Sequence, residues 1–478
     1  MAGIGIRLNK FYKRRSLLSR LGGFAYILGV SVLPMFLVIV AVIIMEKING
    51  FEDIALSSRE LFAASIMYCF IFSLLCTSVF NAVFSRYLSD LIYEERFDAI
   101  KPCFIFGLFL NAAVSSAFAL PFYIRAYIIS DIGGWYLFFS YFLFMGLAFS
   151  FYSMLYLSIT KDYVKITVFY LIAMAVSVLL SVIFVRVFGM DVDFAMLVAL
   201  GIGFLLVASM NSALTLTYFK KNDGSFTGVL SYFRAYWQII LSNFMYILTL
   251  YVHNFVFWGS DMGATVARVY RVCEPYDMAS FLAMLTNISA TAIFISNMET
   301  NFHVTYKKFS ESITGGRYSD IKASKERMLT SLSSGLLALV RVQFIISVII
   351  FLLFMIVLPR IGFAGTVMVI YPVLAAAFFV IFLSYGTILY TYYFDDTKGA
   401  MIMTGIMLAG TFTVSLFAKH LPVVYYGLGP LCGSFAGWTY GYFRLKYMAK
   451  HLETHIFCRG TIVQKGEGIR PDSVVYEK

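Results

Sequence analysis

Twelve apolar runs of about 20 residues each dominate this chain of 478 residues. A bilayer core about 30 Å thick is crossed by roughly 20 helical residues, so each run is long enough to span it. Charged residues make up only 13% of the chain, against about 25% in soluble domains. The sequence therefore predicts an all-α integral membrane protein with about 12 transmembrane helices. The runs cover 21–45, 61–84, 104–124, 135–159, 164–185, 194–218, 237–258, 278–298, 336–358, 367–389, 400–418 and 423–447.

A polar stretch at residues 220–236 divides the runs into two blocks of six. In both blocks the longest polar loop on the linker's side follows the second run, at residues 85–103 and 299–335. Such a correspondence is typical of transporters built from a duplicated helical unit. We therefore expect two pseudo-symmetric six-helix bundles. The expected segments are a basic N-terminal segment 1–20, a first bundle 21–219, a linker 220–236, a second bundle 237–447 and a tail 448–478.

The net charge of +11 is explained by orientation in a membrane. With the N-terminus in the cytoplasm, 28 of the 37 lysines and arginines fall on the cytoplasmic side and 8 on the outer side. This division follows the positive-inside rule. We expect a multi-pass protein of the cytoplasmic (inner) membrane with both termini and the linker in the cytoplasm. The basic residues then neighbour anionic lipid, and no nucleic-acid partner is expected.

Polar residues follow one face of two runs in the second block. Because polar groups exposed to hydrocarbon are costly, they should face the bundle interior or a water-filled cavity, and we expect them to line a substrate pathway. For the carboxylates the alternative is a position at the aqueous interfaces. The residues are Asn243, Tyr246, His253 and Asn254 in the run 237–258, and Glu274, Asp277, Ser280, Thr291 and Glu299 in or beside the run 278–298.

Arg341 lies five residues inside the run 336–358. In a cavity it would bind an anionic group of the substrate, and we include it among the pathway candidates. A long basic side chain at this depth can also snorkel to the lipid headgroups, and this second interpretation is favoured.

Four glycines recur every fourth residue in the last run, at Gly429, Gly433, Gly437 and Gly441. This spacing places them near one helical face, where another helix can approach closely. The pattern predicts a packing seam, with a flexible hinge as the alternative.

The chain carries no motif that supports catalysis. His451, Glu453 and His455 spell H-L-E-T-H, but zinc hydrolases require H-E-x-x-H or H-x-x-E-H. Walker A, dinucleotide-binding and nucleophile-elbow motifs do not occur in the sequence. The six cysteines show no paired spacing, which argues against a disulfide framework or a metal site. We expect no catalytic residue, no metal and no cofactor.

Several short motifs occur together along the chain. They are M-A-G-I-G-I-R-L at 1–8, Y-V-H-N at 251–254 shortly before Trp258, E-P-Y-D at 274–277 and M-E-T-N-F at 298–302. In combination they resemble the PelG family, the membrane transporters of Pel exopolysaccharide systems, which belongs to the multidrug/oligosaccharidyl-lipid/polysaccharide exporter (MOP) superfamily. The resemblance covers residues 1 to about 455.

This resemblance implies a 6+6 helical exporter with a central cavity between its halves. It also implies a cytosolic glycosyltransferase of the PelF type, membrane partners of the PelD and PelE types, and a biofilm polysaccharide rich in partly deacetylated N-acetylhexosamine. We therefore expect the chain to move nascent polymer across the cytoplasmic membrane.

Three alternatives remain open. The nearest is a lipid-linked oligosaccharide flippase or small-molecule antiporter of the same fold. An antiporter needs an ionisable residue deep in a span, and Arg341 alone has such a position, which weighs against ion coupling. A membrane-embedded glycosyltransferase needs a larger extramembrane region than this sequence has. The third alternative is a scaffold for the synthase that does not itself transport.

Overall fold

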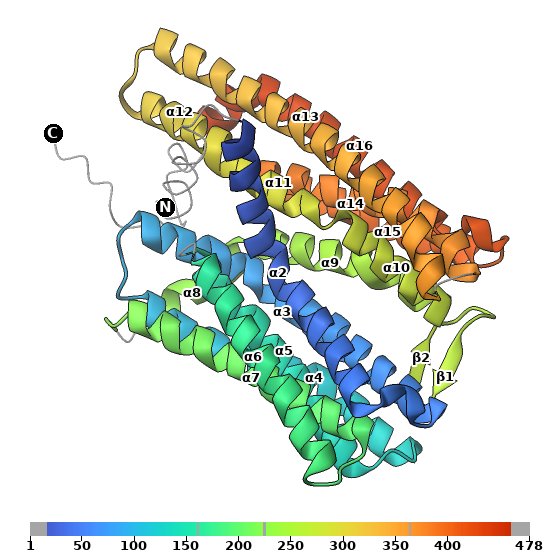
Figure 1. Cartoon of the computed structure of the whole chain (residues 1–478). Coiled ribbons are helices and arrows are strands. Elements are labelled where there is room, and N and C mark those ends of the chain that lie inside the picture. The colour runs from blue at the N-terminus through green and yellow to red at the C-terminus, as the bar shows by residue number, and fades with distance from the viewer. Residues whose placement is uncertain (1–16, 160–161, 223–225, 363–364, 460–478) are drawn as a thin grey trace.

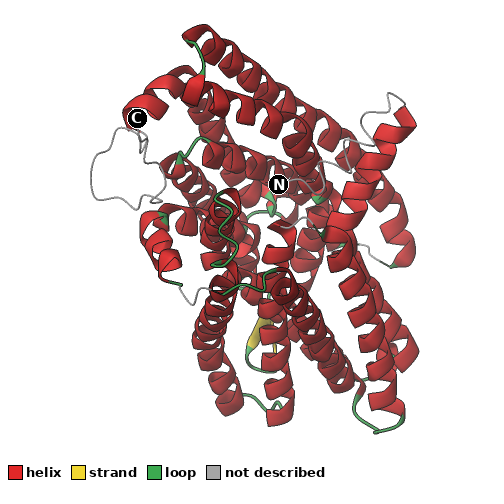
Figure 2. Ribbon diagram, turned by 90° about the vertical axis from the view of Figure 1, so that its left-hand side faces the viewer, coloured by secondary structure: helices red, strands yellow, loops and turns green. Residues whose placement is uncertain are grey.

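The computed structural model describes residues 17–159, 162–222, 226–362 and 365–459. Nearly all of this part of the chain is helical, and its strands form one short hairpin (Figure 2). The fold is therefore all-α, as the apolar runs predict.

The N-terminal half is a bundle of six long helices. Its helices pack closely where small residues meet: a Cβ on Gly146 would lie 3.3 Å from the carbonyl oxygen of Gly201. This contact brings the backbones of α5 and α7 together. The six helices are α2 (Leu17–Asn49), α3 (Leu56–Tyr93), α4 (Ile100–Ile129), α5 (Gly134–Ile159), α6 (Tyr163–Arg186) and α7 (Val192–Tyr218).

The C-terminal half lies above the N-terminal half in the view of Figure 1. A short helix, α8 (Thr227–Ala235), precedes it. Its spans are α9 (Trp237–Phe257), α10 (Glu274–Asn287) continued by α11 (Ser289–Asn297), α13 (Tyr318–Val357), α14 (Thr366–Tyr393), α15 (Thr397–Ala418) and α16 (Leu428–Arg459). Shorter elements are α12 (His303–Gly315), a π-helical segment Met298–Phe302, and 3-10 turns at Phe51–Asp53, Leu358–Ile361 and Val423–Tyr425.

Eleven helical segments of the described chain are long and apolar enough to cross a membrane, with α10 and α11 counted together. The twelfth long helix is α16, whose sequence is interrupted by glycines and by charged residues such as Arg444 and Lys446. It packs against α14 and α15 inside the C-terminal half. The prediction of about 12 membrane helices in two six-helix bundles is confirmed.

The glycine repeat of α16 forms the expected packing seam. A Cβ on Gly433 would lie 2.2 Å from the backbone nitrogen of Thr411 on α15, and one on Gly429 would lie 2.8 Å from the backbone nitrogen of Ser415. Gly437 faces Met407 of α15 in the same way. Only a residue without a side chain fits at these positions, so the two helices are in backbone contact.

Several helix boundaries differ from the apolar runs. α13 begins 18 residues before the run 336–358, and α3 continues to Tyr93, nine residues beyond the run 61–84. Hydropathy detects only the lipid-embedded part of a helix, whereas these helices extend beyond it with charged residues. The segment 299–335 between the two runs is therefore mostly helical, as α12 and the start of α13.

The eighth span is broken at Ile288, between α10 and α11. Side chains of α13 supply hydrogen bonds at the break: Ser347 Oγ donates to Asn287 Oδ1 at 2.7 Å, and Gln343 Nε2 donates to the carbonyl oxygen of Asn287 at 3.4 Å. These contacts satisfy polar groups that hydrocarbon could not. The break carries no charge and leaves the hydropathy of the run unchanged, so the sequence pattern does not reveal it.

The hairpin joins the two halves at one end, which we call the hairpin end (Figure 1). Strands β1 (Ala264–Val266) and β2 (Tyr270–Val272) pair antiparallel, and Ala267 and Arg268 in the turn have positive φ values of 46° and 62°. Hairpin turns with positive φ usually contain glycine or asparagine, which are absent here. For this reason the sequence gives no signal for the hairpin.

Candidate functional site

A cavity of about 1120 Å³ lies between the two halves of the protein. It is lined by α3 and α5 of the N-terminal half and by α9, α12, α14, α15 and α16 of the C-terminal half, together with the turn between α14 and α15. The exposed residues Asp395 and Lys398 lie at its edge, away from the hairpin. We call this edge the mouth.

The N-terminal wall of the cavity is a polar stripe on α3. Ser78, Asn81, Ser85 and Ser89 recur at intervals of three or four residues and all line the cavity. This spacing places them on one helical face. Because the stripe carries hydroxyl and amide groups in a membrane-spanning helix, it presents uncharged hydrogen-bonding groups to the cavity.

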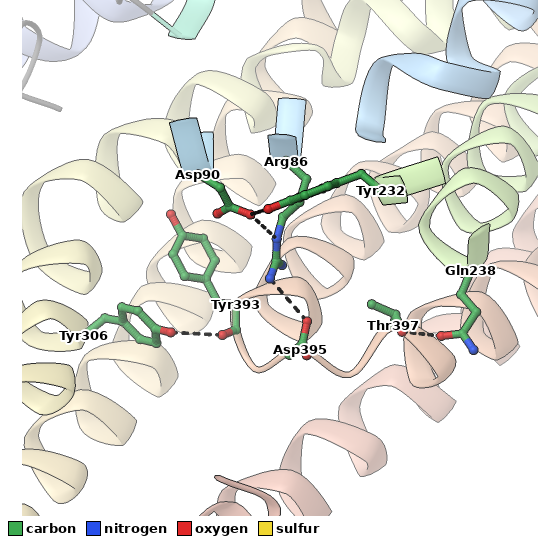
Figure 3. Close-up of polar contacts among 8 residues, drawn as sticks. All are labelled: Arg86, Asp90, Tyr232, Gln238, Tyr306, Tyr393, Asp395 and Thr397. Atoms are coloured by element: carbon green, nitrogen blue, oxygen red, sulfur yellow. Dashed lines mark hydrogen bonds and ion pairs between the residues drawn. The ribbon is translucent and has the colours of Figure 1, made fainter. Parts of the chain in front are cut away.

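The opposite wall is rich in tyrosine. Tyr246 on α9 and Tyr385 on α14 pack with ring centroids 5.4 Å apart, and Tyr306, Tyr392 and Tyr393 lie closer to the mouth. Tyr392 Oη donates to Ser242 Oγ at 3.0 Å. Figure 3 shows that Tyr306 Oη donates to the carbonyl oxygen of Tyr393, at 3.4 Å. These bonds fix the ring positions. Aromatic faces of this kind can stack on apolar faces of a ligand.

Charged residues gather at the mouth. Arg86 of α3 forms an ion pair with Asp395 of the other half, with Nη2 3.4 Å from Oδ1, and its Nε lies 3.7 Å from Oδ2 of Asp90 (Figure 3). Tyr232 Oη donates to Asp90 Oδ2 at 3.1 Å. Burial and the nearby Asp90 carboxylate raise the pKa of Tyr232, so the phenol stays protonated and donates. The mouth is thus a network that crosses from one half to the other.

The turn between α14 and α15 holds this network in place. Asp396 accepts hydrogen bonds from Arg444 Nε at 2.6 Å and from Arg444 Nη2 at 2.8 Å, and also from the backbone N–H of Gly399 at 3.1 Å. The bidentate pair ties the turn to α16, and the bond to Gly399 caps α15. Asp395, next to it, has a positive φ of 55° and pairs with Arg86 of the other half.

The two halves are in contact at the hairpin end. Tyr68 of α3 stacks on Trp258, the residue after α9, with centroids 4.9 Å apart, and Phe72 stacks on Phe255 at 5.7 Å. Tyr68 Oη also donates to the carbonyl oxygen of Arg271 at 2.9 Å and accepts from its backbone N–H at 3.0 Å. The protein is therefore open between its halves at the mouth and closed at the hairpin end.

The residues expected to line a pathway separate into three groups. Asn243 and Tyr246 lie in the cavity wall. Asn243 Nδ2 donates to the carbonyl oxygen of Ser78 at 2.7 Å, so it also joins α9 to α3.

A second group lies between the cavity and the hairpin. Asp277 Oδ1 accepts from Asn254 Nδ2 at 2.7 Å and from Trp258 Nε1 at 2.9 Å, and the backbone N–H of Cys273 donates to its Oδ2 at 2.9 Å. Ser280 Oγ donates to Asn254 Oδ1 at 3.4 Å. Because Asp277 binds the indole that stacks on Tyr68, this group supports the closed end. The list is completed by His253, which is fully buried beside Tyr276 with their Nδ1 and Oη atoms 2.9 Å apart.

The remaining four residues lie elsewhere. Glu274 is exposed at the start of α10, and Thr291 bonds to the carbonyl oxygen of Ile288 in the broken span. Arg341 is exposed on α13 and is not part of the cavity wall. Glu299 lies in the π-helical segment Met298–Phe302.

The sequence patterns missed the α3 wall and the mouth. The polar stripe at Ser78, Asn81, Ser85 and Ser89 has a helical period that would have revealed it, but its small residues leave the run apolar overall. The Arg86 to Asp395 ion pair joins residues 309 positions apart. No local pattern predicts such a contact.

These features define a multi-pass membrane protein with a transporter fold. The eukaryotic MATE transporter AtDTX14 is 11% identical, with a TM-score of 0.56 over 95% of this chain and 100% of that chain. A multidrug resistance MATE family transporter of the MOP superfamily, solved outward-facing, is 12% identical, with a TM-score of 0.57 over 90% and 96%. A MOP superfamily transporter from Pyrococcus furiosus is also 12% identical, with a TM-score of 0.56 over 89% and 96%.

The chain belongs to the PelG family. The family's model, described as "Putative exopolysaccharide Exporter (EPS-E)", matches residues 1–457. No curated protein matches the chain. The resemblance seen in the sequence motifs is thus confirmed over nearly the whole chain, and both family and fold are those of transporters.

Proposed function

We propose that this protein moves nascent exopolysaccharide, a Pel-type glycan rich in N-acetylhexosamine, across the cytoplasmic membrane through the cavity between its halves. The cavity is the observation that carries this proposal. Its volume of about 1120 Å³ exceeds the roughly 300–1,000 Å³ of small-molecule pockets. A polar stripe on one wall and tyrosine rings on the other suit a sugar, which has both hydroxyl edges and apolar ring faces.

The orientation is part of the proposal. The division of basic residues supports a cytoplasmic position for the termini and for the mouth, where a glycosyltransferase would make the chain, and an external position for the hairpin end. Reporter fusions after Lys221 and at the C-terminus should read cytoplasmic, and a fusion at Asp261 should read external. An external C-terminus would contradict the model of twelve spans.

The proposed partners are a cytosolic PelF-like glycosyltransferase and PelD-like and PelE-like membrane proteins. The transferase would deliver the growing chain to the mouth. The helical pair of α12 and the start of α13 supports this arrangement, because α12 lines the cavity through Tyr306 and Phe309 and presents exposed Lys307 and Lys308 outward. A partner docked on this pair would lie beside the cavity mouth.

Filling the cavity tests the proposal. Ser85→Trp places a large ring in the middle of the α3 stripe and should reduce secreted polymer at least tenfold. Leu352→Trp is the matched control, because Leu352 is 54% exposed on α13 and does not line the cavity. Both variants should reach wild-type abundance in the membrane. Normal secretion by the Ser85→Trp variant would show that polymer does not pass this way.

The alternative is a lipid-linked oligosaccharide flippase or a small-molecule antiporter of the same fold. The closed hairpin end favours it, because a cavity open on one side suits alternating access to a compact substrate. Under this alternative the Ser85→Trp variant would accumulate lipid-linked oligosaccharide while free polymer is never found inside the cell. Accumulation of unexported free polymer supports the exporter.

A further inference from the structure

Charge is unevenly distributed along the cavity. Every charged residue of its wall lies at the mouth: Arg86, Asp90, Asp395, Asp396, Lys398 and Arg444. The deeper part, which we call the inner chamber, is lined by Ser78, Asn81, Ser85, Asn243, Tyr246 and Tyr385. None of these six side chains is charged at neutral pH. The inner chamber therefore offers hydrogen bonds without an ionic partner.

One side chain of the inner chamber is not satisfied by the protein. Asn81 Oδ1 is buried and has no hydrogen-bond partner. By contrast, Asn243 on the opposite wall donates to the carbonyl oxygen of Ser78. A buried amide oxygen without a partner is unfavourable in a membrane-spanning helix. Because Asn81 lines the cavity, rotation of its amide would offer this oxygen to a partner from outside the protein.

The charged mouth cannot supply that partner. Arg86 lies five residues after Asn81, or about 7.5 Å along the helix axis at about 1.5 Å per residue. Its guanidinium is engaged by Asp395 and Asp90 and lies 4.9 Å from the ring centre of Tyr236. The inner chamber is thus separate from the ion pairs, and a ligand there meets Asn81 on one side and Tyr385 on the other.

We propose that the inner chamber is a binding site for an uncharged sugar segment and that Asn81 is a substrate-contact residue. Its amide bonds the hydroxyl or acetamido groups of the segment, and the Tyr385 ring packs on a sugar face. A protonated amine would enter this chamber without a carboxylate to pair with, which is unfavourable. This inference rests on the proposed function, because it assigns the contacts that the transported glycan makes.

Binding of defined oligosaccharides to the purified full-length protein tests the inference. The probes are a pentamer of N-acetylglucosamine and a pentamer of glucosamine with its amines protonated, measured by isothermal titration calorimetry. The wild type should bind the acetylated pentamer at least tenfold more tightly than the cationic one. Asn81→Ala should weaken binding of the acetylated pentamer about tenfold, the factor expected for one lost hydrogen bond to a buried polar group.

Two further variants control the experiment. Thr413→Ala, on the exposed face of α15 and outside the cavity wall, should change affinity less than twofold. Asn81→Asp places a carboxylate in the inner chamber and should shift preference toward the cationic pentamer. Thermal unfolding of each variant checks that the protein is intact.

The outcomes separate this inference from the proposed function. If the wild type binds neither pentamer, the proposed glycan pathway is contradicted. If the wild type binds the acetylated pentamer and Asn81→Ala binds it equally well, only the role of Asn81 is overturned. Equal affinity of the wild type for both pentamers would overturn the uncharged character of the site.

Discussion

Arg86 of α3 and Asp395 of the α14–α15 turn form an ion pair between the two halves of the protein, with Nη2 3.4 Å from Oδ1. The neighbouring Asp396 is bound to Arg444 on α16 within the C-terminal half. Asp395 thus connects the turn to the N-terminal half, and Asp396 connects the same turn to α16 of the C-terminal half. Any movement that widens the mouth must break the pair with Arg86 while leaving the pair with Arg444 intact.

Reversing the charge at Arg86 should therefore alter transport more than stability. Asp395 is 62% exposed, so the pair contributes only about 0–1 kcal/mol to folding. We expect Arg86→Asp to lower polymer secretion severalfold through repulsion from Asp395 and Asp90. The double variant with Asp395→Arg should recover part of that loss, as measured by secreted polymer per unit of membrane protein. Absence of any recovery in the double variant would exclude the pair as a functional contact.

Removing the carboxylate of Asp277 should impair export by loosening the hairpin end. Asp277→Ala leaves Trp258 Nε1 and Asn254 Nδ2 without their acceptor, and Trp258 then loses the bond that holds it against Tyr68. We expect reduced secretion at normal abundance, and the same for Asn254→Leu. Glu274→Ala is the matched control, because that carboxylate is exposed one turn earlier. If Glu274→Ala and Asp277→Ala reduced secretion equally, the effect would come from losing any carboxylate in the first turn of α10, and not from losing the bond to Trp258.

Charge reversal on the helical pair of α12 and α13 should release the glycosyltransferase. Lys322 and Arg327 are exposed at the start of α13, and changing both to glutamate should abolish co-purification of the transferase in detergent. Lys47→Glu with Arg268→Glu is the control, since both residues are exposed at the hairpin end of the protein. Full co-purification with the reversed pair would instead identify a surface that rests on anionic lipid.

The seam between α15 and α16 should tolerate no side chain at Gly433. A Cβ there would lie 2.2 Å from the backbone nitrogen of Thr411, and overpacking of this kind costs about 1–3 kcal/mol. Gly433→Ala should lower the midpoint of thermal unfolding. Gly405→Ala on α15 is the control, because its nearest neighbour, Met245 Sδ, is 3.9 Å away. A Gly433→Ala variant as stable as the control would mean that the helices are further apart than described.

The apolar runs predict the bundle well because hydrocarbon requires a continuous helix wherever the chain crosses it. The glycine seam was also predictable, because it depends only on the local spacing of glycines along the continuous helix α16. Helix ends outside the membrane are less constrained, and hydropathy therefore misplaced the start of α13 by 18 residues.

The candidate site was only partly predictable. Asn243 and Tyr246 were identified as polar residues in an apolar run, and they lie in the cavity wall. The same argument selected Asp277 and Asn254, which instead bond to each other and to Trp258. Polarity shows that a side chain avoids lipid, but it does not distinguish a cavity from a buried hydrogen-bonded cluster.

The most direct test of the central claim is to find the polymer inside the cavity during synthesis. A photo-crosslinking amino acid at Asn243, in the cavity wall, should form an adduct with glycan in cells whose synthase is active and none when synthesis is blocked. The same amino acid at Leu352, on the exposed face of α13, should form none. An absence of glycan adducts at Asn243 during active secretion, or equal adducts at both positions, would contradict passage of the polysaccharide between the two halves.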